Sequence, residues 1–392
     1  METFFRTHAY LVEHTDLPVR RALMDEIDWR RPLIGIKGTR GVGKTSFLLQ
    51  YARENFDVRS RRCLYVNMNN FYFQGKGLAD FAREFRLMGG EVLLIDQVFK
   101  HPAWSAELRR CHDENPGLRI VFTGSSVMRL KDENPELRGL VDSYNLRGFS
   151  FREFLNLKTG SHFPPCTLKQ IVAGHERIAA EVLDVVNPLQ GFFQAYLHHG
   201  FYPFFLERRN FSENLLKTMN MMIEVDILLI KQIELKYLAK LKKLLYMLAV
   251  DRPSAPNVSQ LAADIETSRA TVMNYIKYLS DARLINMVYH PNENFPKKPA
   301  RIMMHNTNLM HAIYPNRMEP IDLYETFFQN ALWARHDVRM GDRLSSFTVD
   351  GLRYRVCSEE PRRQHPDVVY ARSDMERGWR QQIPLWLFGF LY

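Results

Sequence analysis

The sequence has 392 residues, of which 46% are hydrophobic and 25% are charged, and its formal net charge is +9. This composition is typical of a folded globular protein and excludes a disordered chain, and the length predicts two to four domains. The excess of basic residues is compatible with a polyanionic partner such as nucleic acid, and equally with a basic surface that has no binding role.

The cysteines and the apolar runs of the sequence indicate in which compartment the protein is expected. The four cysteines, Cys63, Cys111, Cys166 and Cys357, have no partner at C-x-x-C spacing, so the sequence indicates neither a disulfide framework nor a zinc site. The first residues lack the apolar core of a signal peptide, and no apolar run is long enough to span a bilayer. We therefore expect a cytoplasmic protein with no membrane partner.

The first motif follows a mixed-charge segment, residues 1–30, that is expected to form a helical strap. The apolar residues 33–36 lead into Gly38–Thr45, which fits the P-loop pattern G-x-x-x-x-G-K-[ST], and a helical pattern follows. Glycines let backbone N–H groups converge on a phosphate, and the helix N-terminus favours the same anion. Lys44 is expected to reach the β- and γ-phosphates, and the Thr45 hydroxyl to bind Mg²⁺. The residues expected to bind the nucleotide are Gly38, Thr39, Arg40, Gly41, Val42, Gly43, Lys44, Thr45 and Ser46. The alternative is a glycine turn before a helix, without a nucleotide.

A second motif, Glu91–Gln97, places four apolar residues before an acid. A central parallel strand is apolar on both faces, and its last residue emerges at the carboxyl edge of the sheet, where ligands bind. Asp96 is therefore expected to hold Mg²⁺ together with Thr45. The next residue is Gln97, whose carboxamide can orient a water molecule but cannot accept its proton as a carboxylate does. The sequence thus supports nucleotide binding more strongly than rapid hydrolysis.

A third apolar strand, residues 118–122, ends in a polar tip. This tip resembles the sensor strand of AAA-type ATPases, which implies that a small polar group there detects the γ-phosphate. The candidates for this role are Thr123, Ser125 and Ser126. For the two serines the alternative is a helix cap. Further along the chain, an arginine could complete the site of a neighbouring subunit. The candidates are Arg129, Arg138 and Arg147, of which we select Arg138. A plain surface charge is the alternative for each.

The middle of the chain is expected to be helical over residues 156–235 and to form a winged helix over residues 236–295. A basic amphipathic helix, two short helices joined at a capping serine, and a strand follow one another there. The second short helix, expected over Arg269–Ala282, would present polar side chains to DNA. These are Arg269, Asn274 and Lys277. A winged helix that packs on protein is an equal alternative.

The last segment, residues 296–392, combines strands with one helix. The helix is expected over Ile321–His336, and a β-hairpin is expected to turn at Asp350–Gly351. The closing apolar stretch, Pro384–Tyr392, is expected to be a terminal strand or a docking segment.

Taken in order, these motifs resemble a prokaryotic AAA-superfamily ATPase family whose members carry a winged helix and a C-terminal restriction-endonuclease-like domain of unknown function (4143 type). The resemblance implies an α/β protein that uses ATP and Mg²⁺, and it is compatible with a homo-oligomer and with a further protein partner. It implies a P-loop AAA-type parallel-sheet core at 31–155, a helical lid at 156–235, a winged helix at 236–295 and a small α/β nuclease-like domain at 296–392. The segments that carry the resemblance are Gly38–Thr45, Asp96–Trp104, Phe122–Ser126, Phe151–Phe154, Glu325–Phe328 and Pro384–Tyr392.

Two departures from the family pattern affect the expected activity. Family members typically place glutamate where Gln97 stands. In the terminal domain, a metal-dependent nuclease needs an acid and then E-x-K on the next strand. Asp350 fits the first acid and Glu325 could assist from a helix, but Arg355 stands at the second acidic position. An arginine there repels a divalent cation, so we expect no nuclease activity unless Glu359 or the glutamate after it replaces the missing acid.

The leading interpretation is an ATP-binding AAA-type protein with weak or conditional hydrolysis that acts as a nucleotide-controlled switch. The second is a DNA-binding protein that uses the winged helix, with the ATPase as an accessory. The third, a metal-dependent nuclease, is disfavoured.

Overall fold

The computed structural model describes residues 1–128, 134–207, 210–314 and 318–392. The chain divides into two compact units, Met1–Gly148 and Phe149–Tyr392. Both mix helices and strands, so the expected α/β class is confirmed. The finer five-part division stays a prediction.

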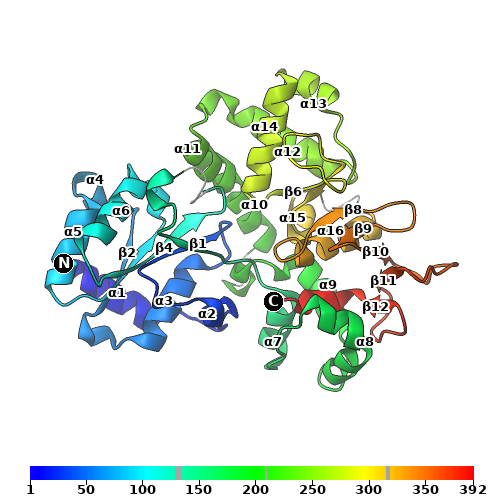
Figure 1. Ribbon diagram of the computed structural model, residues 1–392, viewed down its shortest axis with the longest axis horizontal. Coiled ribbons are helices and arrows are strands. Elements are labelled where there is room, and N and C mark those ends of the chain that lie inside the picture. Colours follow the sequence, from blue (N-terminus) through cyan, green and yellow to red (C-terminus); the bar gives the residue numbers. More distant parts are fainter. Residues whose placement is uncertain (129–133, 208–209, 315–317) are drawn as a thin grey trace. The chain divides into compact units, whose positions relative to one another are not determined.

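The first unit is built on a sheet, part of which is labelled in Figure 1 as β1, β2 and β4. The sheet has five strands in the order β2-β3-β4-β1-β5, and every neighbouring pair is parallel. Its strands are β1 (Leu33–Gly38), β2 (Cys63–Asn67), β3 (Val92–Asp96), β4 (Arg119–Ser125) and β5 (Asp142–Asn145). All five residues of β3 are buried, as expected for a central strand covered on both faces. The sequence predicted the first four strands but not β5, which is short, polar and at the edge of the sheet.

Helices connect these strands and cover them. They are α1 (Glu2–His14), α2 (Leu23–Glu26), α3 (Lys44–Asn55), α4 (Tyr72–Gly75), α5 (Leu78–Leu87) and α6 (Trp104–Glu114), with short 3₁₀ turns η1 (Val58–Ser60), η2 (Val98–Lys100) and η3 (Pro135–Leu137). Helix α5 ends as predicted, before Gly89, whose φ of 89° a glycine adopts without strain. The predicted strap is helical in part: α1 contacts α3 and β2.

The second unit begins with a helical region. Its elements are α7 (Phe151–Thr159), α8 (Leu168–Leu183), α9 (Gln190–Ala195), η4 (Tyr196–Gly200), η5 (Pro203–Glu207), α10 (Phe211–Met221), η6 (Met222–Ile227), α11 (Leu228–Lys231) and η7 (Leu235–Tyr237). Helix α7 starts with a capping box, in which Ser150 and Glu153 each bond the other's backbone N–H. The segments η4 and η6 are π-helical, and helical periodicity alone did not predict them.

Three helices and a small sheet follow. They are α12 (Leu238–Val250), α13 (Val258–Asp264), α14 (Arg269–Asp281), and the antiparallel strands β6 (Ile285–Val288) and β7 (Arg301–Met304). The Ser268 side chain accepts a hydrogen bond from the Thr271 N–H, so the predicted cap of α14 is present.

The unit ends in a mixed five-stranded sheet, ordered β12-β11-β10-β9-β8. It comprises β8 (Val338–Met340), β9 (Phe347–Val349), β10 (Leu352–Cys357), β11 (Val368–Arg372) and β12 (Gln382–Pro384), preceded by α15 (Thr307–Ile313) and α16 (Pro320–Leu332). The β9–β10 hairpin turns at Asp350 and Gly351, which have φ values of 48° and 86°, so this prediction is confirmed. The closing residues form β12 and the 3₁₀ turn η8 (Leu385–Phe390), whose Trp386 is buried in the core with Phe151 and Phe328.

One contact ties the strap to the edge of the first sheet. The His8 side chain on α1 is 2% exposed, and its Nδ1 accepts a hydrogen bond of 3.0 Å from the Tyr65 N–H on β2. Because β2 is an edge strand, this N–H has no strand partner on that side. Burial lowers the pKa of His8 from 6.5 to about 4, so the ring stays neutral and can accept this bond.

Stability of the first unit should therefore depend on pH through His8. As the pH falls from 6.5 towards 4, the unfolded chain binds a proton that the folded ring does not, and folding free energy is lost. Between pH 7 and pH 5, wild type should lose about 2 kcal/mol more stability than His8→Gln, which offers an oxygen acceptor but does not titrate. Denaturant unfolding of the full chain at both pH values measures the difference.

The control is His14→Gln, which changes an exposed histidine on the same helix. It should lose stability with falling pH as wild type does. Equal pH dependence in wild type and His8→Gln would contradict the assignment.

Candidate nucleotide-binding site

The P-loop runs from the end of β1 to the start of α3, as predicted. Gly43 has a φ of 90° and immediately precedes α3, which begins at Lys44. A side chain at Gly38 would place its Cβ 2.5 Å from the carbonyl oxygen of Leu146, so only glycine fits there. The Lys44 ammonium donates to the carbonyl oxygens of Gly38 at 2.8 Å and Thr39 at 2.9 Å. These bonds keep the lysine side chain along the loop.

Asp96 lies at the end of β3 beside this loop. The Thr45 hydroxyl, at the start of α3, donates to its Oδ2 at 2.7 Å, which brings together the two residues predicted to bind the metal. The Tyr65 hydroxyl donates to the same oxygen at 2.9 Å, and the Asn67 amide lies 3.3 Å from it. Thr123 donates to the other oxygen, Oδ1. Asp96 itself is 1% exposed, so these donors replace water around a buried carboxylate.

Tyr65 is suited to donate in this cluster. Burial raises the pKa of its phenol, and the nearby charge of Asp96 raises this pKa further. The hydroxyl therefore keeps its proton and donates it to the carboxylate.

Gln97 stands in a strained backbone conformation next to Asp96. Its φ of 57° and ψ of 46° are left-handed, which is uncommon for a residue with a side chain. Its N–H donates to the Thr123 hydroxyl at 2.9 Å, and that hydroxyl in turn donates to Asp96. Its side-chain oxygen is buried and has no hydrogen-bond partner among the residues that the structure describes. The Thr123 hydroxyl thus holds both the Asp96 carboxylate and the backbone of Gln97 in position.

A buried arginine from the strap supports the loop. Arg21 is 7% exposed, and its guanidinium donates to the carbonyl oxygen of Val42 in the loop at 3.2 Å. It also donates to the carbonyl oxygens of Arg147 at 2.7 Å and Gly148 at 3.1 Å, at the end of the first unit. A multidonor guanidinium is well suited to join carbonyl groups from separate segments.

Other predicted residues lie away from this cluster or outside the described ranges. Arg138 follows η3, is exposed, and makes no ion pair with any residue in those ranges. Arg129 lies outside the described residues. Ser125 is the last residue of β4, and its hydroxyl lies 3.4 Å from the Val127 N–H, as in a local cap.

The residues predicted to contact DNA lie on α14 but differ in exposure. Arg269 and Asn274 are exposed. Lys277 does not fit the expectation of an exposed basic residue: its side chain is 23% exposed and forms an ion pair of 2.7 Å with Asp281. Only the first two are therefore free to meet a partner from this face.

The predicted nuclease residues are not gathered in one place. Asp350 sits at the hairpin turn, where its carboxylate contacts the His336 ring at 2.6 Å and the Asp337 N–H at 2.9 Å. Glu325 on α16 instead forms an ion pair of 2.5 Å with Arg301.

Sequence reasoning missed three residues of the nucleotide site, namely Tyr65, Asn67 and Arg21. Tyr65 and Asn67 alternate along β2, so their side chains lie on the same face, and β2 pairs with β3 such that Asn67 is opposite Asp96. The carboxyl-edge rule used for Asp96 could have identified Asn67. Arg21 gave no local signal, because its partners are 21 and more than 120 residues away.

Three features define the class of protein, a P-loop nucleotide-binding domain. They are strand β1, the glycine loop that leads from it into α3, and the buried carboxylate at the end of β3, which lies two strands away in the sheet. Comparison with protein families agrees, because residues 30–155 match the AAA domain family. Residues 191–317 match a second family, the domain of unknown function DUF8612. The winged helix at 236–295 and the nuclease-like domain at 296–392 stay predictions.

Two relatives come from Methanocaldococcus jannaschii. "Uncharacterized protein MJ1637" is 27% identical over 283 residues, which are 69% of this chain and 59% of the relative. "Uncharacterized protein MJ1544" is 25% identical over 266 residues, 64% of this chain and 55% of the relative. The chain thus spans under two thirds of the length of either relative.

Solved structures give weaker likenesses. The Aeropyrum pernix ORC1 protein in complex with DNA is 12% identical with a TM-score of 0.30, and covers 85% of this chain and 93% of its own. The E. coli MS115-1 HORMA:CdnC:Trip13 complex is 17% identical with a TM-score of 0.28, and the match covers 52% of this chain and 73% of that one. C. elegans PCH-2 is 17% identical with a TM-score of 0.23, and the match covers 36% of this chain and 39% of that one. These TM-scores are too low to support a conclusion about function. Within the described ranges, no helix is both long and apolar enough to cross a membrane.

The hydrogen bond from Tyr65 to Asp96 should stabilise the first unit. Tyr65→Phe removes a donor from a buried carboxylate, and we expect it to lower the free energy of unfolding by about 1 to 2 kcal/mol. Chemical denaturation of the full chain measures this loss.

Tyr51→Phe is a matched control, because Tyr51 is also buried in this unit and its hydroxyl bonds no residue within the described ranges. It should change stability little. A Tyr65→Phe protein as stable as this control would show that the hydroxyl is not needed to satisfy Asp96.

Proposed function

We propose that this protein binds ATP at the P-loop and acts as a nucleotide-controlled switch with slow hydrolysis. The observation that carries the proposal is the 2.7 Å contact between Thr45 and Asp96, next to a loop whose lysine is in place. The AAA domain match supports a nucleotide in general. The choice of ATP over other nucleotides rests on the family resemblance of the sequence.

The oxygen donors at this site fit Mg²⁺. The Thr45 hydroxyl and the Asp96 carboxylate are hard ligands of the kind that Mg²⁺ prefers. Over the described ranges, no group of three His, Cys, Asp or Glu side chains could hold a metal by itself. This agrees with a magnesium site that takes its remaining ligands from phosphate and water. When bound, the ion neutralises phosphate charge.

The other proposed roles in nucleotide binding and hydrolysis belong to side chains of this protein. Lys44 is proposed to bind the phosphates, and the N-terminus of α3, which begins at this residue, to contribute its positive end. Thr123 positions Asp96 and the backbone of Gln97. The Gln97 side chain can orient a water molecule but cannot take up its proton, so hydrolysis is expected to be slow. Arg138, which is exposed, is proposed to reach the site of a second copy of the chain.

ATP binding should depend on Lys44. We expect Lys44→Ala to weaken ATP affinity at least about tenfold, because it removes a charge contact of the kind worth more than 1.4 kcal/mol. Equilibrium binding with Mg²⁺ measures this. Lys76→Ala, which changes an exposed lysine of the same unit, should bind ATP as wild type does. A wild-type protein that fails to bind ATP would overturn the proposal.

Turnover should depend on Gln97. Gln97→Glu introduces a carboxylate that can accept the water's proton, a contribution that is typically 10²-fold or more for a well-placed base. We expect at least a roughly tenfold higher steady-state hydrolysis rate with little change in ATP affinity. Gln74→Glu, at an exposed position, serves as the charge-matched control. An unchanged rate would count against a water-orienting role for Gln97.

A second candidate function is DNA binding by a winged helix. The specific observation is the order α12, α13, α14 and the β6–β7 pair, with Arg269 and Asn274 exposed on α14. Binding to duplex DNA that weakens with salt and with Arg269→Ala would distinguish it from protein packing.

A further inference from the structure

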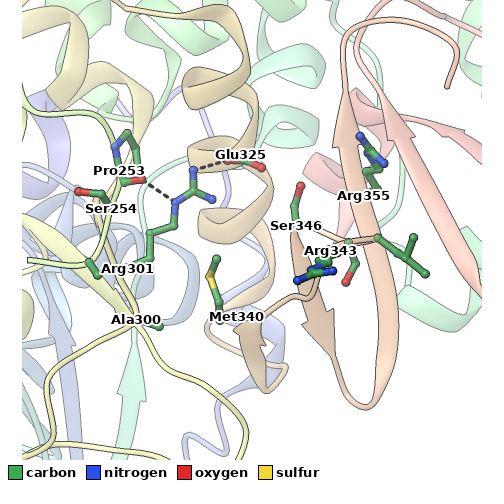
Figure 2. A pocket seen from close by; sticks show the side chains of 12 residues that line it. Pro253, Ser254, Ala300, Arg301, Glu325, Met340, Arg343, Ser346 and Arg355 are labelled. Atoms are coloured by element: carbon green, nitrogen blue, oxygen red, sulfur yellow. Dashed lines mark hydrogen bonds and ion pairs between the residues drawn. The ribbon is translucent and has the colours of Figure 1, made fainter. Parts of the chain in front are cut away.

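A hollow of about 440 Å³ lies in the second unit. It is lined by segments before α13, at the start of β7, on α16, after β8 and on β10. The lining residues are Pro253, Ser254, Ala255, Ala300, Arg301, Glu325, Met340, Arg343, Leu344, Ser345, Ser346 and Arg355. Figure 2 shows Arg301 beside Pro253 and Ser254 on one side, and Arg343, Ser346 and Arg355 on the other. The sequence analysis singled out Glu325 and Arg355, and both line this hollow.

One of the three arginines is already neutralised. Arg301 forms an ion pair of 2.5 Å with Glu325 and donates to the carbonyl oxygen of Pro253 at 3.1 Å (Figure 2). The side chains of Arg301 and Glu325 are only 12% and 10% exposed. A second carboxylate, Asp322, lies 3.9 Å from Arg301. The Arg301–Glu325 pair therefore forms one side of the hollow, and Glu325 is the only carboxylate among the lining residues.

The other two arginines have no such partner. Arg343 and Arg355 are exposed, and neither forms an ion pair with any residue of the described chain. Asp342, the acid next to Arg343 in sequence, is already bound by Arg353 at 3.0 Å and by the Ser345 hydroxyl at 2.8 Å. Two guanidinium groups without an ion-pair partner in the described chain thus line one hollow, where their positive charge favours an anion.

We propose that this hollow binds a small phosphate-bearing anion through Arg343 and Arg355. Guanidinium groups bind phosphate oxygens with paired hydrogen bonds, and two of them balance a doubly charged group. The volume is within the range of small-molecule pockets, which favours a compact ligand over a nucleic acid duplex. The Ser346 hydroxyl, which lies 3.3 Å from the Val356 N–H, stands on the same wall and can donate to the anion. A divalent cation is disfavoured, because the lining charge is positive. The proposal does not depend on ATP binding at the P-loop.

The test uses the full chain carrying Lys44→Ala, so that the P-loop contributes little to binding, and pyrophosphate as the probe. Calorimetric titration should detect binding that weakens as ionic strength rises. The double substitution Arg343→Gln and Arg355→Gln should weaken it at least about tenfold, since each removes a charge-assisted contact. Both positions are exposed, so the variant is expected to fold, and its unfolding curve checks this.

The matched control is Arg362→Gln. Arg362 lies in the same unit, is also exposed, and does not line the hollow. It should bind pyrophosphate as the Lys44→Ala parent does. Absent pyrophosphate binding, equal affinity in the double variant, or binding of duplex DNA in place of pyrophosphate would each overturn the proposal. None of these outcomes bears on ATP binding, which is measured with Lys44 present.

Discussion

The nucleotide site depends on one buried carboxylate. Asp96 ends a strand that is buried on both faces, and a charge in that position is stable only if donors surround it. Those donors come from α3, β2 and β4, so the same bonds that satisfy the charge also hold three neighbouring elements in register. The hydrogen bonds that satisfy the Asp96 carboxylate therefore also hold the start of α3, next to the P-loop, in position. A change at any donor is therefore expected to lower the stability of the first unit.

Two arginine environments illustrate how burial changes what a guanidinium does. Arg21 is buried and uses its donors on backbone carbonyl oxygens, so its role is structural. Arg343 and Arg355 are exposed, lack an acidic partner in the described chain and line a hollow, so their donors remain available to an outside ligand. The net charge of +9 does not separate these cases, because it counts both kinds of arginine equally.

The sequence predicted the parts of the fold that are encoded locally. A glycine loop before a helix, four apolar residues before Asp96, and the Asp350–Gly351 turn each need only a few consecutive residues, and all three stand where they were expected. Apart from the Thr45–Asp96 pair, contacts between distant segments were not predicted. Tyr65 reads as an ordinary strand residue until β2 is paired with β3. Lys277 was expected to be exposed, although Asp281, four residues further along α14, stands at the spacing of a helical ion pair. The polar edge strand β5 carries no hydrophobic signal and is specified only by its neighbour β1.

The strap also sets the limits of what can fold alone. The AAA domain match begins at residue 30, but Arg21 and His8 lie before that point and supply bonds to the P-loop, to the end of the unit and to the edge strand. A fragment cut at the family boundary would leave the carbonyl groups of Val42, Arg147 and Gly148 without these donors, in an interior from which water is largely excluded. The residues that match the AAA domain family thus leave out α1 and α2, which belong to the first compact unit, Met1–Gly148.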